Sequence, residues 1–391
     1  MDQKAAELDR ALAAVRAQVP DDLFVEAEVY LKAAQWALRY GEFSSKASVD
    51  QTLAVLDTGL ERAAQLAANK PAWPKKKGSF SRAYRSRIDG SAQPYALTIS
   101  SYHTDDGPAE WLEVVLHDRD ESLNEVAFLY AHDHVLVPYQ DHQFIQLDIF
   151  GRGNNAYRWA GETDVWEALE KVKTQYHIDP VRIALRGFGM GGTGAWHLGL
   201  HSPESWAVVE ASQGFVETEH YGQIPKPPPY VHIYDALDYA ANAVELPIAA
   251  YAGEDSAERP GLQAFQQFLA DQHYQFEGSN PAEDRVKLHL NFLIGPKTGY
   301  AWEPASRKLS TRFVERHQAP GSLELGRFRI ATYTERYNHY SFLTIDQLST
   351  PYQRAEINFG EDSRYVIDIK TQNISRFTLQ GGPLANAFRV D

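Results

Sequence analysis

Residues 183–197 read Ile-Ala-Leu-Arg-Gly-Phe-Gly-Met-Gly-Gly-Thr-Gly-Ala-Trp-His. The first of these residues form a short apolar run, as in a buried strand, and those from Gly192 onward fit a helix. The glycines between them suit a tight turn, because glycine adopts backbone conformations that other residues avoid. The stretch therefore predicts a strand that turns sharply into a helix.

Strands and helices alternate on both sides of this turn, from residue 79 to about residue 318. Predicted strands cover 95–102, 111–117, 144–149, 183–186, 206–211, 247–251 and 286–294, and predicted helices cover 165–176, 192–200, 260–272 and 303–317. Such alternation favours an α/β fold, with a doubly wound, mostly parallel sheet between helices. An insertion at about 214–242, rich in proline and tyrosine, is expected to lie over the carboxyl end of the sheet and to shape a pocket there.

Two flanking regions differ from this α/β domain (79–318). Residues 1–72 predict an N-terminal helical region, in which Ser48 and Asp50 are expected to cap the third helix. The predicted apolar faces are Leu8, Leu12 and Val15; Val29, Ala33 and Trp36; and Val49, Leu53, Leu56 and Leu60. Residues 71–78, rich in proline and lysine, are typical of a linker. Residues 319–391 predict a C-terminal β domain of short strands.

Composition limits the classes of function. The 391 residues carry a net charge of −14, which argues against a nucleic-acid or anionic-membrane partner. No apolar run is long enough to span a bilayer. The N-terminus lacks the layout of a signal peptide, but a removed signal leaves no trace, so cytoplasmic and secreted locations both stay open. The chain has no cysteine, which excludes disulfides and a cysteine nucleophile.

We predict no metal ion or other cofactor. The short run His132-Asp133-His134 carries suitable side chains for a metal, but it is expected to be a polar loop before a strand-like segment at 135–137.

Five short motifs follow one another along the α/β domain. They are His117-Asp118-Arg119-Asp120, His177-Ile178-Asp179-Pro180-Val181-Arg182, the glycine-rich run from Gly187 to Trp196, Gly253-Glu254-Asp255, and Gly295-Pro296-Lys297-Thr298-Gly299-Tyr300. In this order the region from about 93 to 317 resembles an α/β-hydrolase of the secreted esterase and prolyl-oligopeptidase type, which includes polyhydroxybutyrate-depolymerase-like and feruloyl-esterase-like proteins. The resemblance implies a G-x-S-x-G nucleophile turn, followed along the chain by the catalytic acid and then the base.

The nucleophile and base positions implied by this resemblance carry other residues. Gly189 stands where the family has its serine, and glycine has no side chain to attack a carbonyl carbon. The base usually follows a glycine after the last strand, and here Tyr300 follows Gly299. Ordinary hydrolysis by a serine and a histidine is therefore not expected.

The other two catalytic elements are also altered. The step that leads to the acid in the family reaches Ser256, with Asp255 one position early. The loop that supplies oxyanion-stabilising N–H groups has Asp118 and Asp120 at its two glycine positions. Carboxylates close to a developing oxyanion would repel it.

Three hypotheses follow. The first is a non-hydrolytic pseudoenzyme whose pocket binds a small polar, aromatic or sugar-like ligand or a partner. Its predicted lining is His117, Asp118, Arg119, Asp120, Phe188, Met190 and Tyr300, with the aromatic insertion. The second is a repurposed lyase or isomerase, or an unusual esterase or peptidase, that uses Tyr300 with Asp255. The third is dinucleotide binding, because Gly187, Gly189 and Gly192 satisfy G-x-G-x-x-G and Glu210 ends the next strand.

Overall fold

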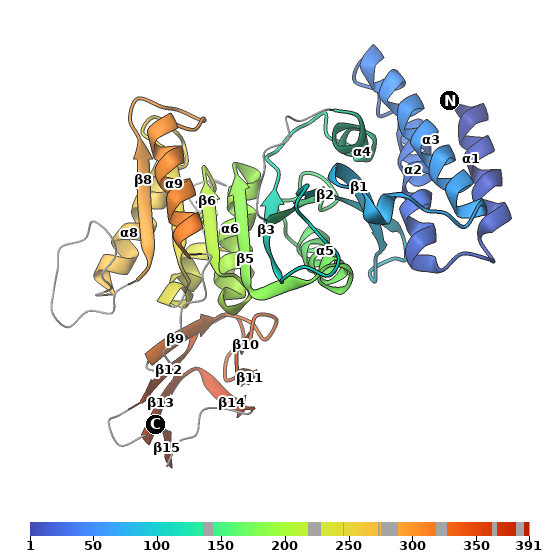
Figure 1. Cartoon of the computed structure of the whole chain (residues 1–391). Coiled ribbons are helices and arrows are strands. Elements are labelled where there is room, and N and C mark those ends of the chain that lie inside the picture. The colour runs from blue at the N-terminus through green and yellow to red at the C-terminus, as the bar shows by residue number, and fades with distance from the viewer. Residues whose placement is uncertain are drawn as a thin grey trace. The chain divides into compact units, whose positions relative to one another are not determined.

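The computed structural model describes residues 1–135, 144–217, 228–244, 246–272, 274, 288–317, 327–361, 366–380 and 387–390 (Figure 1). The chain divides into two units, Met1–Asp179 (unit 1) and Pro180–Asp391 (unit 2), which are described separately below. This division does not test the predicted boundaries near 72–79 and 318–319, which stay predictions. Within the predicted insertion, residues 218–227 lie outside the described residues.

Unit 1 begins with three helices, α1 (Asp2–Val15), α2 (Asp21–Tyr40) and α3 (Lys46–Ala67), which pack as a bundle (Figure 1). Leu8 and Leu12 are buried, as their spacing predicts. Two details differ from the prediction. Ser48 lies inside α3, which begins after Ser45, and Trp36 is 45% exposed on α2. The buried face of α3 is shifted by one position from the predicted one, to Thr52, Leu56 and Gly59. Gly59 has no side chain, so Leu8 and Tyr30 pack closely against the helix there.

The sheet strands of unit 1 are β1 (Gly78–Arg85), β2 (Ala92–Ile99), β3 (Glu110–Leu116) and β4 (Phe144–Ile149), in the order β1-β2-β4-β3. The first two pairings are antiparallel, and β3 pairs with β4 in parallel. Helix α4 (Glu125–His134) packs on β1 and β2, and α5 (Ala160–Gln175) packs on β1 and β4. A 3-10 turn, η1 (Trp73–Lys75), lies within the predicted linker and buries Trp73.

The run His132-Asp133-His134 ends α4 and is not a loop, so that prediction is wrong. The reason is the position of Asp133, whose carboxylate accepts hydrogen bonds from Tyr30 Oη (2.7 Å) and from the backbone N–H of Ser81 (2.9 Å). A helical conformation places this side chain between the bundle and β1. In the portion of the chain that is described, no cluster of His, Asp or Glu residues has the geometry to hold a metal ion.

The bundle and the sheet of unit 1 share one hydrophobic core, which includes Ala83 of β1 and Ala92 of β2. A buried ion pair crosses the same interface. The Arg82 guanidinium donates to both carboxylate oxygens of Glu26, at 2.6 and 2.7 Å, and the two side chains are 3% and 0% exposed. Because a buried charge without a partner is costly, removing either Glu26 or Arg82 alone is expected to destabilise unit 1.

Unit 2 contains the parallel strands β5 (Ile178–Phe188, which begins at the unit boundary), β6 (Val208–Ser212), β7 (Ile248–Gly253) and β8 (Leu290–Gly295), paired in that order. Helix α9 (Pro304–His317) packs on the face that carries Ala184 and Val208. Helix α6 (Met190–His201) packs on the opposite face through Gly199 and Val209, and α8 (Arg259–Asp271) packs beside it. The short 3-10 segments are η2 (Pro203–Ser205), η3 (Pro229–Ile233) and η4 (Ala236–Val244).

The strand order within each unit, β1-β2-β4-β3 and β5-β6-β7-β8, is that of the corresponding part of an α/β-hydrolase sheet. The strands are mostly parallel, and helices cover them. The predicted fold class is therefore confirmed: the chain has an α/β-hydrolase fold.

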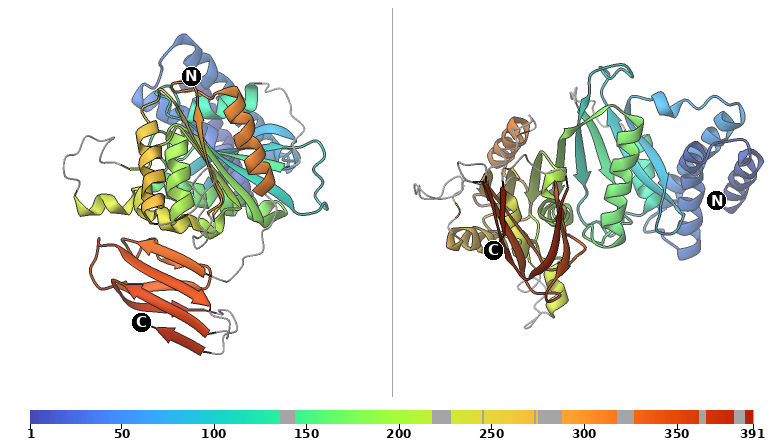
Figure 2. Two further views of the ribbon diagram at one scale, coloured as in Figure 1. Left: turned by 90° about the vertical axis from the view of Figure 1, so that its left-hand side faces the viewer. Right: turned by 90° about the horizontal axis from the view of Figure 1, so that it is seen from below.

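The C-terminal part of unit 2 forms two small sheets (Figure 2). Their strands are β9 (Arg327–Thr332), β10 (His339–Tyr340), β11 (Leu343–Leu348), β12 (Ala355–Glu361), β13 (Val366–Gln372), β14 (Ile374–Leu379) and β15 (Ala387–Val390). The orders are β10-β11-β14 and β15-β13-β12-β9. Asn242 of η4 exchanges two hydrogen bonds with the backbone of Ala331, which fixes β9 against η4.

Candidate functional site

The turn between β5 and α6 is sharp at Gly189, the predicted nucleophile position. Gly189 is the N-cap of α6, with φ 58° and ψ −120°. L-residues with a side chain adopt this region rarely and at a cost. Its N–H donates to the Ser212 carbonyl oxygen (2.8 Å), and its own carbonyl oxygen accepts from the N–H of Thr193 (3.0 Å). The backbone is thus held in the conformation that would project a side chain, at a residue that has none.

The other glycines of the motif are explained by close packing of the chain on itself. A Cβ atom at Gly187 would overlap the carbonyl group of Gly191, and one at Gly192 would overlap the carbonyl of Ser212. Glu210, the acid of the dinucleotide hypothesis, is 5% exposed and pairs with Arg186 at 2.8 Å, and it also accepts a hydrogen bond from Ser310 Oγ. Because this carboxylate is engaged within the protein, the structure does not favour a role in binding ribose.

The loop after β7 carries the predicted acid position, Ser256, and Asp255 before it. Its backbone is tied to the loop after β8, since the N–H of Asp255 donates to the Thr298 carbonyl oxygen (2.9 Å) and Glu254 Oε2 accepts from the N–H of Lys297 (2.8 Å). The Asp255 side chain is exposed. Ser256 is half-buried, and its Oγ has no hydrogen-bond partner within the described residues. The carboxylate next to the predicted acid position is therefore accessible to solvent.

Tyr300, which stands at the predicted base position, is 52% exposed. Its ring meets the edge of Phe188, with centroids 5.3 Å apart and planes at 68°. Trp302 lies 6.1 Å from Phe188 and stacks on Tyr251 at 4.2 Å. Gln213 holds the loop after β8, because its Nε2 donates a hydrogen bond to the Gly299 carbonyl oxygen (2.7 Å). An aromatic surface, formed by Phe188, Tyr300 and Trp302, thus borders the elbow of unit 2, where Met190 begins α6 and is half-buried.

The hydroxyl groups next to the elbow are not placed to replace the serine. Thr193 and Ser212 are 4% and 0% exposed. Thr193 Oγ1 accepts a hydrogen bond from the N–H of Phe215 (2.9 Å). Both hydroxyls therefore lie inside the protein, where a substrate carbonyl does not reach them.

The histidines described next, which belong to unit 2, contact residues other than Gly189 and Tyr300. His197 follows Gly189 by eight residues, which is about 12 Å along α6 at 1.5 Å per residue. Its ring is buried against Tyr337, and the ring of His232 pairs with Asp238 at 2.6 Å. His289 precedes β8, at the end of the strand away from Tyr300, and packs near His317. His220, one of the loop histidines of the predicted insertion, lies outside the described residues.

In unit 1, the loop after β3 carries His117, Asp118, Arg119 and Asp120. The two ring nitrogens of His117 lie 2.7 Å from the Asp118 carbonyl oxygen and 3.0 Å from that of Phe150. Arg119 and Asp120 are exposed. Asp120 accepts hydrogen bonds from the hydroxyl and the N–H of Ser122, which lower the pKa of its carboxyl group. This loop therefore presents an exposed carboxylate, Asp120, at the predicted oxyanion-loop position.

The loop after β4, residues 150–159, was not predicted as part of a site. It contains six residues with positive φ, four of which are not glycine: Gly151, Arg152, Gly153, Ala156, Tyr157 and Trp159. Trp159 caps α5 with φ 52° and ψ −115°, nearly the conformation of Gly189, and is 61% exposed. Tyr157 Oη donates to the His117 carbonyl oxygen (3.3 Å), which joins this loop to the loop after β3.

No family model and no curated protein matches the chain. Solved structures do resemble it. A ferulic acid esterase matches at 16% identity with a TM-score of 0.45 over 61% of this chain and 97% of that chain. The fluorophosphonate-binding serine hydrolase FphF of Staphylococcus aureus matches at 15%, with a TM-score of 0.42 over 61% and 99%. An S-formylglutathione hydrolase from Agrobacterium tumefaciens matches at 10%, with a TM-score of 0.42 over 61% and 95%. The fold assignment rests on the strand order, not on these similarities.

No helix among the residues described here is both long enough and apolar enough to cross a membrane.

Proposed function

We propose that this protein is a non-hydrolytic α/β-hydrolase-fold protein that binds a small ligand at the elbow of unit 2. The observation that carries the proposal is Gly189 at φ 58° and ψ −120°, a backbone set to present a nucleophile at a residue without a side chain. Tyr300 in the base position supports it, because a phenol does not replace an imidazole as a general base near neutral pH.

The ligand class follows from the aromatic surface. Phe188, Tyr300 and Trp302 offer ring faces and edges, and Tyr300 is more than half exposed. An aryl group or the apolar face of a sugar ring packs well on such a surface, and the Tyr300 hydroxyl adds a hydrogen-bonding group. The lyase or isomerase alternative stays a prediction without a specific observation in its favour, because the Asp255 side chain is exposed to solvent.

Activity assays test the catalytic part of the proposal. The full chain is incubated with 4-nitrophenyl acetate and methyl ferulate, and with a fluorescent fluorophosphonate, beside an active esterase. We expect no turnover above the buffer blank and no labelling. Gly189→Ser should also remain inactive, because the base is absent too. Turnover by Gly189→Ser would show that a histidine already occupies the base position, and the proposal would be wrong.

Titration calorimetry tests the binding part, with a 4-nitrophenyl glycoside as the probe. Tyr300→Ala should weaken binding roughly 2- to 10-fold, the range expected for the loss of one aromatic contact. Tyr300→Phe keeps the ring and should bind nearly as tightly as the wild type. Equal binding by all three proteins would place the ligand elsewhere.

A further inference from the structure

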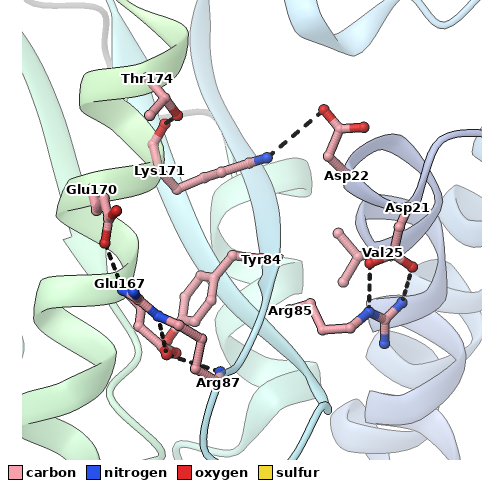
Figure 3. Close-up of a pocket in the computed structure, with 10 residues that line it drawn as sticks. All are labelled: Asp21, Asp22, Val25, Tyr84, Arg85, Arg87, Glu167, Glu170, Lys171 and Thr174. Carbon is pink, nitrogen blue, oxygen red and sulfur yellow. Dashed lines mark hydrogen bonds and ion pairs between the residues drawn. The ribbon is translucent and has the colours of Figure 1, made fainter.

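A second candidate site lies in unit 1, at a cleft of about 400 Å³. One wall is the beginning of α2, with Asp21 and Asp22, and the other wall is α5, with Glu167 and Lys171. The end of β1 forms the floor through Tyr84 (Figure 3). A volume of this size suits a small molecule. The cleft is separate from the elbow and does not depend on the proposed function.

The two arginines at the end of β1 are occupied by carboxylates of the walls, one on each side. Arg85 donates to both oxygens of Asp21, at 2.8 and 2.9 Å. Arg87 donates to Glu167 Oε1 through its backbone N–H (2.9 Å) and its Nε (3.2 Å), and also pairs with Glu170 at 2.5 Å. These pairs join the end of β1 to each wall and leave the arginines with little capacity for an added anion.

Across the cleft the pairing is weak. Figure 3 shows Lys171 extended from α5 toward Asp22 on α2, and the ammonium nitrogen lies 3.9 Å from the nearest carboxylate oxygen. This distance is beyond a hydrogen bond. Asp22 is largely exposed, so solvent screens the attraction. A ligand cation can therefore replace Lys171 at Asp22 at little cost.

Glu167 gives an independent indication of what the cleft binds. Its side chain is 3% exposed, and Oε1 is used by Arg87. Its second oxygen, Oε2, has no hydrogen-bond partner among the described residues. Buried acceptors are almost always satisfied in native proteins, and an ionised one most of all. The unmet need in this cleft is thus for a hydrogen-bond donor, and a cationic donor meets it best.

We propose that this cleft binds a short aliphatic diamine or polyamine. The carboxylates of Asp22 and Glu167 lie on opposite walls, and each has capacity for a further donor, so the cleft favours a cation. One ammonium group would bind Asp22, a second would donate to Glu167 Oε2, and the methylene chain between them would lie along Val25 and the ring of Tyr84, which Figure 3 places between the two walls. Two ammonium groups joined by an apolar chain match two separated carboxylates joined by an apolar floor.

Titration calorimetry on the full chain tests this, with putrescine and spermidine as probes and 1,4-butanediol as the uncharged analogue. We expect the amines to bind and the diol not to bind. Glu167→Gln should weaken spermidine binding roughly tenfold or more, because a charge-assisted hydrogen bond is lost. Glu170→Gln removes the same charge from the same wall, but its carboxylate serves Arg87 at the surface, so it should change affinity less than about twofold.

Lys171→Met provides a test that does not depend on the Glu167 variant folding. It removes the cation that competes for Asp22, so spermidine should bind several-fold more tightly. The proposal is overturned if the wild type binds neither amine, if butanediol binds as well as putrescine, or if Lys171→Met leaves the affinity unchanged. Equal losses in Glu167→Gln and Glu170→Gln would also overturn it, because they would reveal general attraction to an acidic surface.

Discussion

Replacing Gly189 with alanine measures the strain that the elbow imposes. A side chain at φ 58° and ψ −120° costs about 1–3 kcal/mol, and the hydrogen bonds of Gly189 to Ser212 and Thr193 prevent the turn from relaxing. For a unit of this size that loss lowers the melting temperature by roughly 2–12 °C. Gly189→Ser should lose about as much, since the cost arises in the backbone.

Gly299→Ala is the matched control for this experiment. Gly299 lies in the neighbouring loop, has no positive φ, and has no atom within 4 Å of the place where a Cβ would stand. This variant should therefore melt within about 2 °C of the wild type. Urea unfolding and differential scanning calorimetry of the three proteins give the comparison. If Gly189→Ala is as stable as Gly299→Ala, the turn is not strained, and the interpretation of this corner as a nucleophile elbow fails.

Three other predictions concern unit 1. Trp159→Gly should stabilise the protein by roughly 1 kcal/mol in urea unfolding, because it relieves φ 52° at an exposed residue, whereas Trp159→Ala keeps the strain and should not stabilise it. Glu26→Gln should lower the free energy of unfolding by about 3–5 kcal/mol, because it leaves the Arg82 guanidinium buried without its anionic partner. The double variant Glu26→Leu/Arg82→Met should lose clearly less. Equal losses in a double-mutant cycle would refute the coupling. Burial raises the pKa of the Asp164 carboxyl group from 3.8 to about 6, so the native state binds the proton of this group more tightly than the unfolded state. The contribution of Asp164 to the free energy of unfolding should therefore fall by up to about 3 kcal/mol as the pH rises from 4 to 6, and then stay level. Asp164→Asn should remove that slope, and a wild-type-like pH profile in the variant would contradict the assignment.

The sequence predicts the fold class because short apolar segments, such as Ile248–Gly253 of β7 and residues 183–185 within β5, alternate with helical patterns. The predicted strand 144–149 coincides with β4, and the turn at Gly189 lies where the glycines indicate. Strand β1 could not be found in this way, because Ser81 and Arg82 are polar residues that are buried by partners far away in the sequence. The register of a polar strand depends on those partners, which a local pattern does not contain.

At the candidate site too, some features could be predicted from the sequence and others could not. Spacing along the chain locates Gly189, Ser256 and Tyr300, since each follows a recognisable strand. It does not reveal that Tyr300 packs on Phe188, because that contact depends on how two loops meet. The strained Trp159 was also beyond prediction, since nothing in its local sequence requires a conformation that bulky residues avoid. The orphaned oxygen of Glu167 is a property of packing alone.

Because helices α1, α2 and α3 share a core with β1 and β2, the protein should not tolerate removal of its first residues. A truncation that starts at residue 78, where the resemblance to hydrolases would invite a cut, removes Glu26 and uncovers the apolar side of β1 and β2 while Arg82 stays behind. The shortened product should accumulate as inclusion bodies. Residues 1–77 cannot be exchanged for another segment unless that segment brings its own carboxylate to the position of Glu26.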